Sequence, residues 1–431
     1  MIAVLLFILV SLALCRLHRP PMKITVSFNS RKSDSFGSYV AYKVGSVDLN
    51  SEPGSISELA VIRRYSDFEW LYSHLVLCYP GVIMPVLPAK RRLGRFNVDF
   101  IEHRRRGLEG FLARLSSHSS LGAAPLFTKF LQCDDIELAK VKEDLKASKK
   151  KVAAIVTEWI EGTVNNLSHP KIEIEKSLSD VKIEEITQYV TALEQQMLLV
   201  SRHSENLVRR SREIAQAYCQ FGDSIASLGR SEGGTIGSAL QEVGSTSRFL
   251  SDSAAKYAEV EAREFEEPLD EYVRLIASVK SALQQRVERR NTYIAAILDV
   301  DVKKQTLNRL AATPGKEDLV LQKQELQQRA ERVMEAAKAD FDQVSDRLLV
   351  EFEDFKRQKA KEMRSILLNF ISLQIEYSRS TETVWNELSS SLQSAMPRED
   401  DDLLAEELTG EYRSIHPETF VSGDPNVLME C

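Results

Sequence analysis

Apolar positions repeat with two different periods along this chain, and the change of period divides it in two. Up to about residue 133, short segments alternate apolar and polar positions or are rich in β-branched residues, with turn residues between them. We therefore expect strands and then helices in the order Lys23–Phe28, Tyr39–Val47, Glu58–Tyr65, Phe68–Cys78 and Phe100–Leu115. Such a mixture is typical of a small α+β domain.

From about residue 140 the spacing becomes helical, and a heptad repeat predicts a coiled bundle. The first long helix carries two sets of positions spaced by seven residues, and each set is called a seam here. This helix should end at Gly229 and Gly233-Gly234. One seam contains Ile186, Leu193, Val200, Leu207, Ile214, Phe221 and Leu228. The interleaved seam contains Val190, Met197, Ser204, Ser211, Tyr218 and Ile225.

Two further long helices are expected. The second runs from about Ile236 to Leu310, where an eight-residue step from Tyr257 to Phe265 breaks the heptad and Pro268 should kink the helix. The third runs from about Glu317 to Ala395, and its inward positions are Leu326, Val333, Phe341, Val344, Leu348, Phe352, Phe355, Ile366, Phe370, Leu373, Tyr377, Val384 and Leu388.

The three helices predict an elongated bundle with more apolar surface than one chain covers. The apolar stripe along each helix is too wide and too long for a single neighbouring helix to cover. We therefore expect two chains to associate along the length of their bundles.

Composition excludes several classes of protein. The chain has 431 residues, of which 43% are hydrophobic and 28% charged, so it can bury a core and is not disordered. The five cysteines form no CxxC pair, which indicates reduced thiols in a cytosolic protein and no disulfide framework or zinc site. Walker, HExxH and GxSxG motifs are all absent, so we expect no enzyme and no cofactor.

The net charge of −7 is unevenly distributed. Residues 22–133 hold 15 Lys and Arg against 9 Asp and Glu, a balance of +6, whereas residues 397–431 hold 2 against 10, a balance of −8. A basic domain within an acidic protein suggests an anionic ligand bound at one place and no nucleic acid.

The first 21 residues are apolar and leave three interpretations open. The run from Ile2 to Cys15 is too short to span a bilayer and has no basic residue before it. It could be a secretory signal, a membrane anchor or sequence upstream of the true start, and the cytosolic character of the remainder favours the last.

Three basic elements are the strongest chemical signal. The segment RRYSDF at residues 63–68 joins a strand to a helix, Lys90 follows the proline-rich loop MPVLPAK, and FIEHRRRGLEGF covers residues 100–111. Arginine offers paired donors to a phosphate, and a tyrosine ring offers a flat face to a sugar ring. If the three elements converge, they would form an inositol-phosphate site; otherwise they are solvated basic stretches.

The order and spacing of these three motifs resemble a phox-homology (PX) domain. With three long helices after it, the chain resembles a sorting nexin of the PX-BAR type, and the segment from Phe265 to Val273 and the late helix at Lys361–Trp385 look most like the retromer-associated members. The resemblance implies a three-stranded α+β PX domain followed by an all-α, elongated three-helix BAR coiled-coil bundle.

The resemblance also implies a ligand, phosphatidylinositol 3-phosphate. Arg64 matches the arginine that holds the 3-phosphate and Tyr65 the aromatic residue under the inositol ring. Lys90 matches the lysine near the 1-phosphate, and Arg104 the arginine that reaches the ring hydroxyls. Arg63, Arg105 and Arg106 are expected at the periphery, either facing anionic lipid or solvated.

Other segments are expected to meet the membrane. In the proline-rich loop, Val82, Ile83 and Leu87 are the residues expected to enter the bilayer. A basic run precedes an amphipathic segment, whose expected membrane-inserting residues are Val152, Ile155, Trp159 and Ile160; a linker helix packed on the bundle is the alternative. On the bundle, the basic residues Lys303 and Lys304 are expected to face lipid.

The sequence thus predicts five regions: an apolar segment (1–21), a PX domain (22–133), an amphipathic linker helix (140–168), a BAR domain (171–396) and an acidic tail (397–431) with a dileucine pattern. The expected function is curvature-dependent endosomal cargo sorting on the cytosolic face of early endosomes. Expected partners are the lipid, a second PX-BAR sorting nexin in a homodimer or heterodimer, and a retromer-type complex. The alternatives are a coiled-coil scaffold or tether without specific lipid recognition, and a secreted protein.

Overall fold

The computed structural model describes residues 22–34, 37–48, 59–90, 97–146, 176–312 and 317–395. These residues form two compact units. Of the described residues, one unit contains those from 22 to 204 together with those from 267 to 366, and the other contains 205–266 together with 367–395.

The first unit begins with an antiparallel sheet of three strands in the order β1-β2-β3. The strands are β1 (Met22–Asp34), β2 (Gly37–Asp48) and β3 (Leu59–Arg64). Val44 pairs with Val26 on one side and with Val61 on the other, and β1 carries an irregularity between Phe28 and Ser30. All three predicted strands are confirmed.

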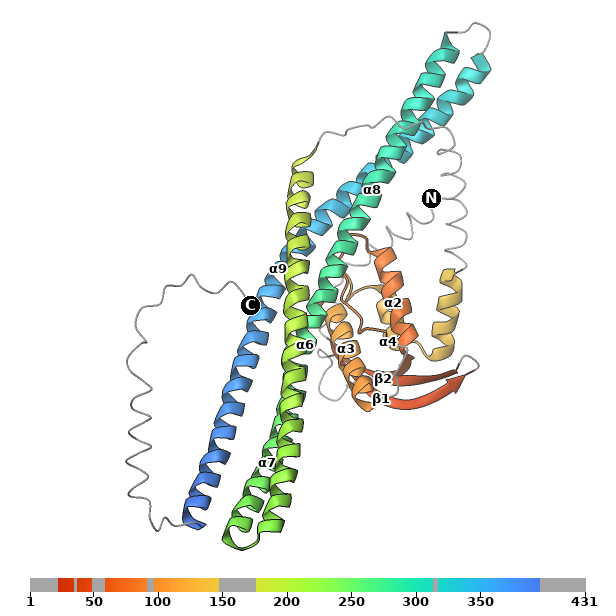
Figure 1. The fold of residues 1–431 in the computed structure, drawn as a ribbon. Helices are drawn as coiled ribbons and strands as arrows, with labels where there is room; N and C mark the ends of the chain where they lie inside the picture. The colour runs from red at the N-terminus through yellow and green to blue at the C-terminus, as the bar shows by residue number, and fades with distance from the viewer. Residues whose placement is uncertain are drawn as a thin grey trace, which may run out of the picture. The chain divides into compact units, whose positions relative to one another are not determined.

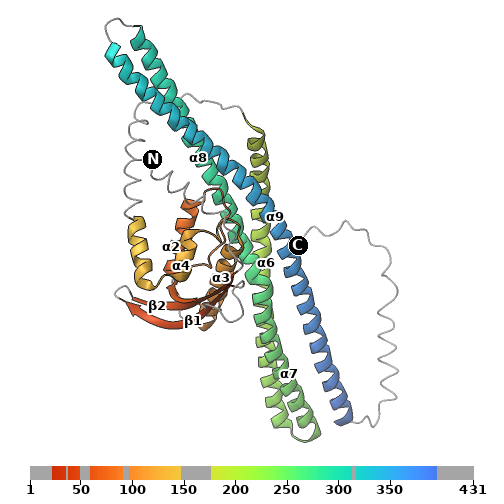
Figure 2. The same cartoon turned by 180° about the vertical axis from the view of Figure 1, so that it is seen from behind.

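Helices α2 (Tyr65–Cys78), α3 (Val98–Ser117) and α4 (Pro125–Gln132) cover one face of this sheet, as Figures 1 and 2 show. Residues 135–146 form a further helix. The core lies between sheet and helices and includes Val26, Tyr42, Phe68, Leu108 and Phe127. Helix α4 was not predicted from the sequence, although a proline at its first turn is a typical start signal.

Four long helices follow: α6 (Leu178–Glu232), α7 (Gly234–Glu261), α8 (Glu267–Ala311) and α9 (Glu317–Ala395). As predicted, α6 ends at the glycines, where Gly233 and Gly234 adopt φ of 65° and 58°. The predicted third helix corresponds to α9, and each of its predicted inward positions is buried or half-buried.

The second predicted helix is not a single kinked helix. A five-residue π-helix, η1 (Ala262–Glu266), separates α7 from α8. It begins within the eight-residue step from Tyr257 to Phe265 and includes Phe265. A π-turn accommodates the one extra residue of this step. Pro268 is the second residue of α8, a position that tolerates the missing N–H, so it begins this helix.

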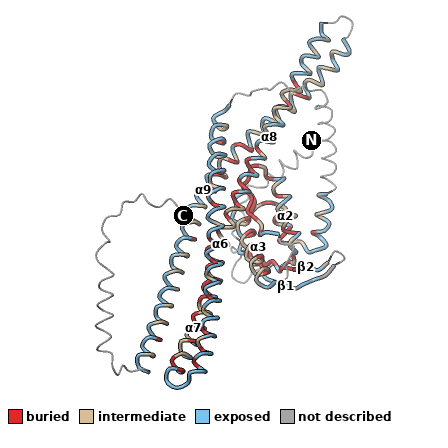
Figure 3. The backbone as a smooth tube through the Cα atoms, in the orientation of Figure 1, coloured by how far each residue is buried: buried red, intermediate tan, exposed pale blue. Residues whose placement is uncertain are grey.

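The two heptad seams of α6 have different environments. In the interleaved seam, Val190, Met197 and Ser204 are buried and the remaining positions are half-buried. In the other seam, Val200, Leu207, Ile214, Phe221 and Leu228 are between 43% and 50% exposed in the single chain. Exposed apolar positions also lie on α9, and Figure 3 shows the exposed backbone along both helices. The described residues therefore cover the interleaved seam and leave the other seam exposed from Val200 onward, in line with the expectation from the width of the stripes.

The proline-rich loop packs on α8 and α9 within the first unit, so the residues expected to enter the bilayer are largely covered here, and their membrane insertion stays a prediction. Val82 and Ile83 are 2% and 7% exposed, and Leu87 is half-buried. Ser278 of α8 donates to the Met84 carbonyl at 2.7 Å. Gly81 has a φ of +83°, and a Cβ there would lie 2.9 Å from the Val344 carbonyl oxygen of α9.

Basic side chains of α3 dock on acidic residues of α8 and α9. Arg106 lies 2.7 Å and His103 2.9 Å from Glu267. Burial alone would raise the pKa of Glu267, but these two partners lower it. Further along α3, Arg114 pairs with Glu362 and Glu271, both at 3.1 Å. His103, Arg106 and Arg114 of α3 therefore serve intramolecular packing.

A buried arginine joins α6, α8 and α9 in the first unit. Arg286 of α8 is 5% exposed, forms an ion pair with Asp180 of α6 and donates from Nε to Ser345 Oγ of α9 at 2.8 Å. Its guanidinium also lies 4.7 Å from the ring centre of Phe341. Burial would raise the pKa of Asp180, but hydrogen bonds from Arg286 and Ser177 lower it from 3.8 to about 2.

This pair should make stability depend on pH in a defined window. Because the pKa of Asp180 is depressed in the folded state, its contribution of about 2 kcal/mol is present above pH 4 and disappears as the pH falls to 2. The difference in unfolding free energy between the protein and Asp180→Asn, measured with denaturant from pH 5 to pH 2, should shrink accordingly. A difference that is constant across this range would contradict the assignment.

Candidate anion-binding site

Two of the predicted site residues lie where β3 meets α2. Arg64 is the residue before α2, and its backbone N donates to Asp67 Oδ2 at 2.8 Å, which caps the helix. The Arg64 side chain is 44% exposed and its Nε lies 3.7 Å from Asp67 Oδ1. A guanidinium at a helix N-terminus, where backbone N–H groups also point outward, favours an anion.

Tyr65 is held in a fixed orientation by the proline-rich loop. Its hydroxyl donates to the Pro88 carbonyl at 2.7 Å, and burial raises the pKa of this phenol. Pro88 can approach α3 because Gly107 has no side chain: a Cβ there would lie 2.9 Å from the Cβ of Pro88. The aromatic ring is thus positioned before any ligand binds.

Arg104 of α3 lies over this ring. Its guanidinium is 4.5 Å from the ring centre of Tyr65 and 4.3 Å from that of Phe100, and the residue is 7% exposed. Its Nε and Nη2 are buried and have no hydrogen-bond partner among the described residues. Buried donors without an acceptor are costly, so this arrangement suits a polar ligand.

Lys90 is connected to the site through α2. Its Nζ forms an ion pair with Glu69 at 2.8 Å and its side chain is 64% exposed. Glu69 lies four residues after Tyr65, on the same face of the helix. The structure therefore brings Tyr65 and Arg104 into contact and pairs Lys90 with Glu69 of α2. Arg64 directly precedes Tyr65 in the chain, and no contact between Arg64 and Arg104 is observed among the described residues.

The other three arginines make contacts within the chain, and Arg63 is buried, whereas the sequence predicted it at the periphery. Arg63 is 1% exposed and donates to the Phe130 carbonyl at 2.8 and 3.0 Å. Arg105 pairs with two glutamates of its own helix and donates to the Val26 carbonyl at 2.8 Å. Arg106 pairs with Glu267, as described above.

Two residues of the site escaped sequence analysis. Asp67 lies next to Arg64, and its position three residues into the helix is a typical capping signal. Lys142 of the helix at residues 135–146 forms an ion pair with Asp67 at 2.5 Å. No sequence pattern connects these two residues, because 75 positions separate them.

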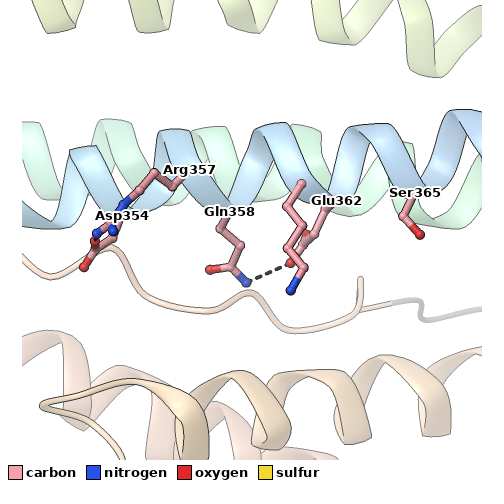
Figure 4. Close-up of a pocket in the computed structure, with 6 residues that line it drawn as sticks. Asp354, Arg357, Gln358, Glu362 and Ser365 are labelled. Carbon is pink, nitrogen blue, oxygen red and sulfur yellow. Dashed lines mark hydrogen bonds and ion pairs between the residues drawn. The ribbon is translucent and has the colours of Figure 1, made fainter.

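Two hollows were found in the described parts of the chain. One of about 370 Å³ lies beside Arg64 and includes Tyr39, Asp67 and Lys142 among its lining residues. The other, of about 570 Å³, is lined by one side of α9, where Figure 4 shows Gln358 bonded to Glu362. Acidic and basic residues balance in the second hollow, which indicates no particular ligand. No group of His, Cys, Asp and Glu suited to a metal ion occurs in the residues that were placed.

The remaining predicted membrane contacts are only partly visible. Lys304 of α8 is exposed, and Lys303 is half-buried beside Asp299. The amphipathic residues Val152, Ile155, Trp159 and Ile160, the apolar segment 1–21 and the acidic tail lie outside the described residues. Among the helices that could be searched, none has the length and apolar character needed to cross a bilayer.

Family models match both parts of the chain. The PX domain model matches residues 54–134, and a model described as Vps5 C terminal like matches residues 163–391, more than half of the chain. Neither model describes an enzyme. The predicted domain boundaries differ from these limits and stay predictions.

Relatives cover most of the chain. It is 28% identical to Sorting nexin 1 of Arabidopsis thaliana over 381 residues, which are 87% of this chain and 94% of that protein. It is 26% identical to human Sorting nexin-1 over 351 residues, 78% of this chain and 65% of the human protein. Sorting nexin-2 of Bos taurus is 25% identical over 377 residues, 84% of this chain and 71% of that protein.

The fold is also that of a solved relative. The cryo-EM structure of the SNX-BAR Mvp1 tetramer matches with a TM-score of 0.60 over 85% of this chain and 100% of that chain, at 18% identity. A PX domain joined to a BAR region implies membrane binding and curvature. The family models, the relatives and the fold agree that this chain belongs to the PX-BAR sorting nexins, which combine a PX domain with a Vps5-like BAR region.

Proposed function

We propose that this protein binds phosphatidylinositol 3-phosphate through its PX domain and sorts cargo into tubules that leave the early endosome. The observation that carries the proposal is the buried guanidinium of Arg104, which lies over Tyr65 with two donors that have no partner among the described residues. A hydroxylated ring placed on Tyr65 would supply the missing acceptors.

Each site residue has a role in this proposal. Arg64, at the N-terminus of α2, holds the 3-phosphate through paired charge-assisted hydrogen bonds. Tyr65 packs under the inositol ring, and Arg104 donates to the ring hydroxyls at the 4 and 5 positions. Lys90 leaves Glu69, its present partner at 2.8 Å, to reach the 1-phosphate.

The BAR region supplies a second membrane contact through dimerisation. The exposed seam of α6 described above is an apolar surface that a second BAR region would cover. A dimer joins two PX sites in one body, so that individually weak lipid contacts reinforce one another through effective concentration. Lys303 and Lys304, together with the predicted amphipathic segment, are the proposed additional contacts with lipid.

This combination suits a coincidence detector of lipid identity and curvature. We propose that the protein is peripheral on the cytosolic face of early endosomes and acts in retrograde transport with a retromer-type partner. Either a homodimer or a heterodimer with another PX-BAR sorting nexin would provide the curved surface. The alternative is a scaffold or tether without specific lipid recognition.

Replacing Arg64 by alanine should abolish binding that depends on phosphatidylinositol 3-phosphate. Loss of a paired, charge-assisted phosphate contact costs about 1.5–3 kcal/mol, which weakens binding about tenfold to a hundredfold. The measurement is co-sedimentation of the full chain with liposomes that contain either phosphatidylinositol 3-phosphate or unphosphorylated phosphatidylinositol.

Lys43→Ala is the matched control, because it removes one exposed positive charge from β2 without touching the site. It should leave binding unchanged. Sedimentation that is indifferent both to the 3-phosphate and to Arg64→Ala would contradict the lipid assignment and favour the scaffold.

A further inference from the structure

The motif around Arg64 has a second set of contacts that the proposed lipid site does not use. Arg63, Asp67 and Trp70 all contact the chain that follows α4. Arg63 reaches the carbonyls of Phe130 and Cys133 and pairs with Asp135 at 3.2 Å. The helix at residues 135–146 is thereby fixed against the same strand–helix junction that presents Arg64.

Within that helix, Lys142 contacts the junction directly. Its Nζ lies 2.5 Å from Asp67 Oδ1 and 5.3 Å from the ring centre of Trp70. The Lys142 side chain is 21% exposed and that of Asp67 is 11% exposed, so water screens this pair less than an ion pair at the surface. Leu138, one turn earlier in the helix, is 2% exposed and anchors it.

Asp67 is therefore shared between two cations. Its Oδ1 lies 2.5 Å from Lys142 and 3.7 Å from Arg64 Nε, while its Oδ2 accepts the backbone N–H of Arg64. The longer of the two side-chain distances is that to Arg64, the residue proposed to hold the phosphate. A carboxylate satisfied by Lys142 competes less for the Arg64 guanidinium.

We propose that Lys142 is a positioning residue of the lipid site: by neutralising Asp67, it keeps the Arg64 guanidinium available to the 3-phosphate without touching the lipid. This inference rests on the proposed function. Without Lys142, the Asp67 carboxylate attracts the Arg64 guanidinium more strongly, and this intramolecular ion pair must then be broken before the phosphate binds. Asp67 and Lys142 thus set the affinity of the site.

The arrangement also connects the lipid site to the chain beyond it. The helix at residues 135–146 leads directly into the segment predicted to lie in the membrane surface. Any event that displaces this helix from Asp67 would lower the affinity of Arg64 for phosphate. Lys142 is the residue through which that effect would pass.

A double-mutant cycle on the full chain tests this role. Liposomes with phosphatidylinositol 3-phosphate are the probe, and those with unphosphorylated phosphatidylinositol are the reference. Lys142→Ala should weaken binding about three- to tenfold, the range of a partly buried ion pair, and Lys142→Arg should restore it. In a background of Asp67→Asn, where the amide can still cap Arg64, Lys142→Ala should have no further effect.

Lys146→Ala is the matched control on the same helix. Its side chain is 69% exposed and, among the described residues, pairs with Glu143 of its own helix, so binding should not change. A direct contact between Lys142 and the phosphate would make Lys142→Ala equally costly in the wild-type and the Asp67→Asn backgrounds, which would overturn the proposal. Wild-type binding by Lys142→Ala would overturn it as well.

The proposed function and this inference can fail separately. If Arg64→Ala leaves binding intact, the lipid assignment itself is wrong. If Arg64→Ala abolishes binding while Lys142→Ala leaves it unchanged, the lipid site stands and only the positioning role is wrong.

Discussion

Glutamate at both Ile214 and Phe221 should convert the dimer into a monomer. Both side chains belong to the exposed seam of α6, at 50% and 48% exposure in the single chain, so the monomer fold loses little. In a dimer each carboxylate would be buried without a partner, at about 3–5 kcal/mol each. The dissociation constant should rise on the order of a thousandfold or more, as sedimentation equilibrium would measure.

A control with the same charge change separates the seam from the helix as a whole. Gln216 and Gln220 are exposed on α6 and, two and six residues after Ile214, point away from the seam. Glutamate at both Gln216 and Gln220 should leave the protein dimeric in the same measurement. A dimer that survives glutamate at Ile214 and Phe221 would show that another surface joins the two chains.

Replacing Arg63 by alanine should destabilise the PX domain by about 3–5 kcal/mol, the cost of breaking a buried charged network by removing one partner. The side chain is buried, and the carbonyls of Phe130 and Cys133 would lose their donor. Burial lowers the pKa of this guanidinium, while Asp67 and Asp135 act in the opposite direction. Hydrogen exchange in α4 and in residues 135–146 should accelerate accordingly.

Two comparisons make this prediction specific. Arg63→Lys should not restore stability, because an ammonium cannot reproduce the fork that reaches two carbonyls and Asp135 together. Arg64→Ala should leave exchange unchanged, because that side chain is 44% exposed. Equal effects of the two alanine variants on exchange would contradict the division of roles between the neighbouring arginines.

Contacts with α8 and α9 change how the PX domain can meet a membrane. The sequence predicts that the proline-rich loop and the basic residues of α3 meet lipid. In the structure, both segments contact α8 and α9 instead. Glu351, for example, accepts from the Ile83 backbone N at 3.3 Å and pairs with His118 at 3.0 Å. By contrast, the side chains of Arg64 and Lys90 are 44% and 64% exposed.

Much of the architecture follows from the sequence alone. Alternation of apolar residues predicted the three strands, and the heptad repeat predicted α6 and the long α9. The eight-residue step between Tyr257 and Phe265 indicated an irregularity, and a π-turn lies there. These features depend on local periodicity, which a single sequence contains in full.

The sequence also predicted the residues of the proposed lipid site through motif and spacing. Arg64, Tyr65, Lys90 and Arg104 come from three separated segments, and the structure places Tyr65 and Arg104 in contact. Residue type alone, however, could not distinguish Arg63 from Arg64. Their different environments arise because successive residues near the end of a strand point to opposite sides.

Only the tertiary structure decided which polar and apolar groups meet. The repeat on α6 does not determine which of its two seams is buried within the chain. The sequence also does not reveal that Val82 joins the PX core or that the backbone N of Ile83 donates to Glu351 of α9. The ion pair between Lys142 and Asp67 likewise joins residues 75 positions apart. Local pattern determines which elements form and which faces are apolar, whereas the partner of each face depends on contacts between segments that are far apart along the chain.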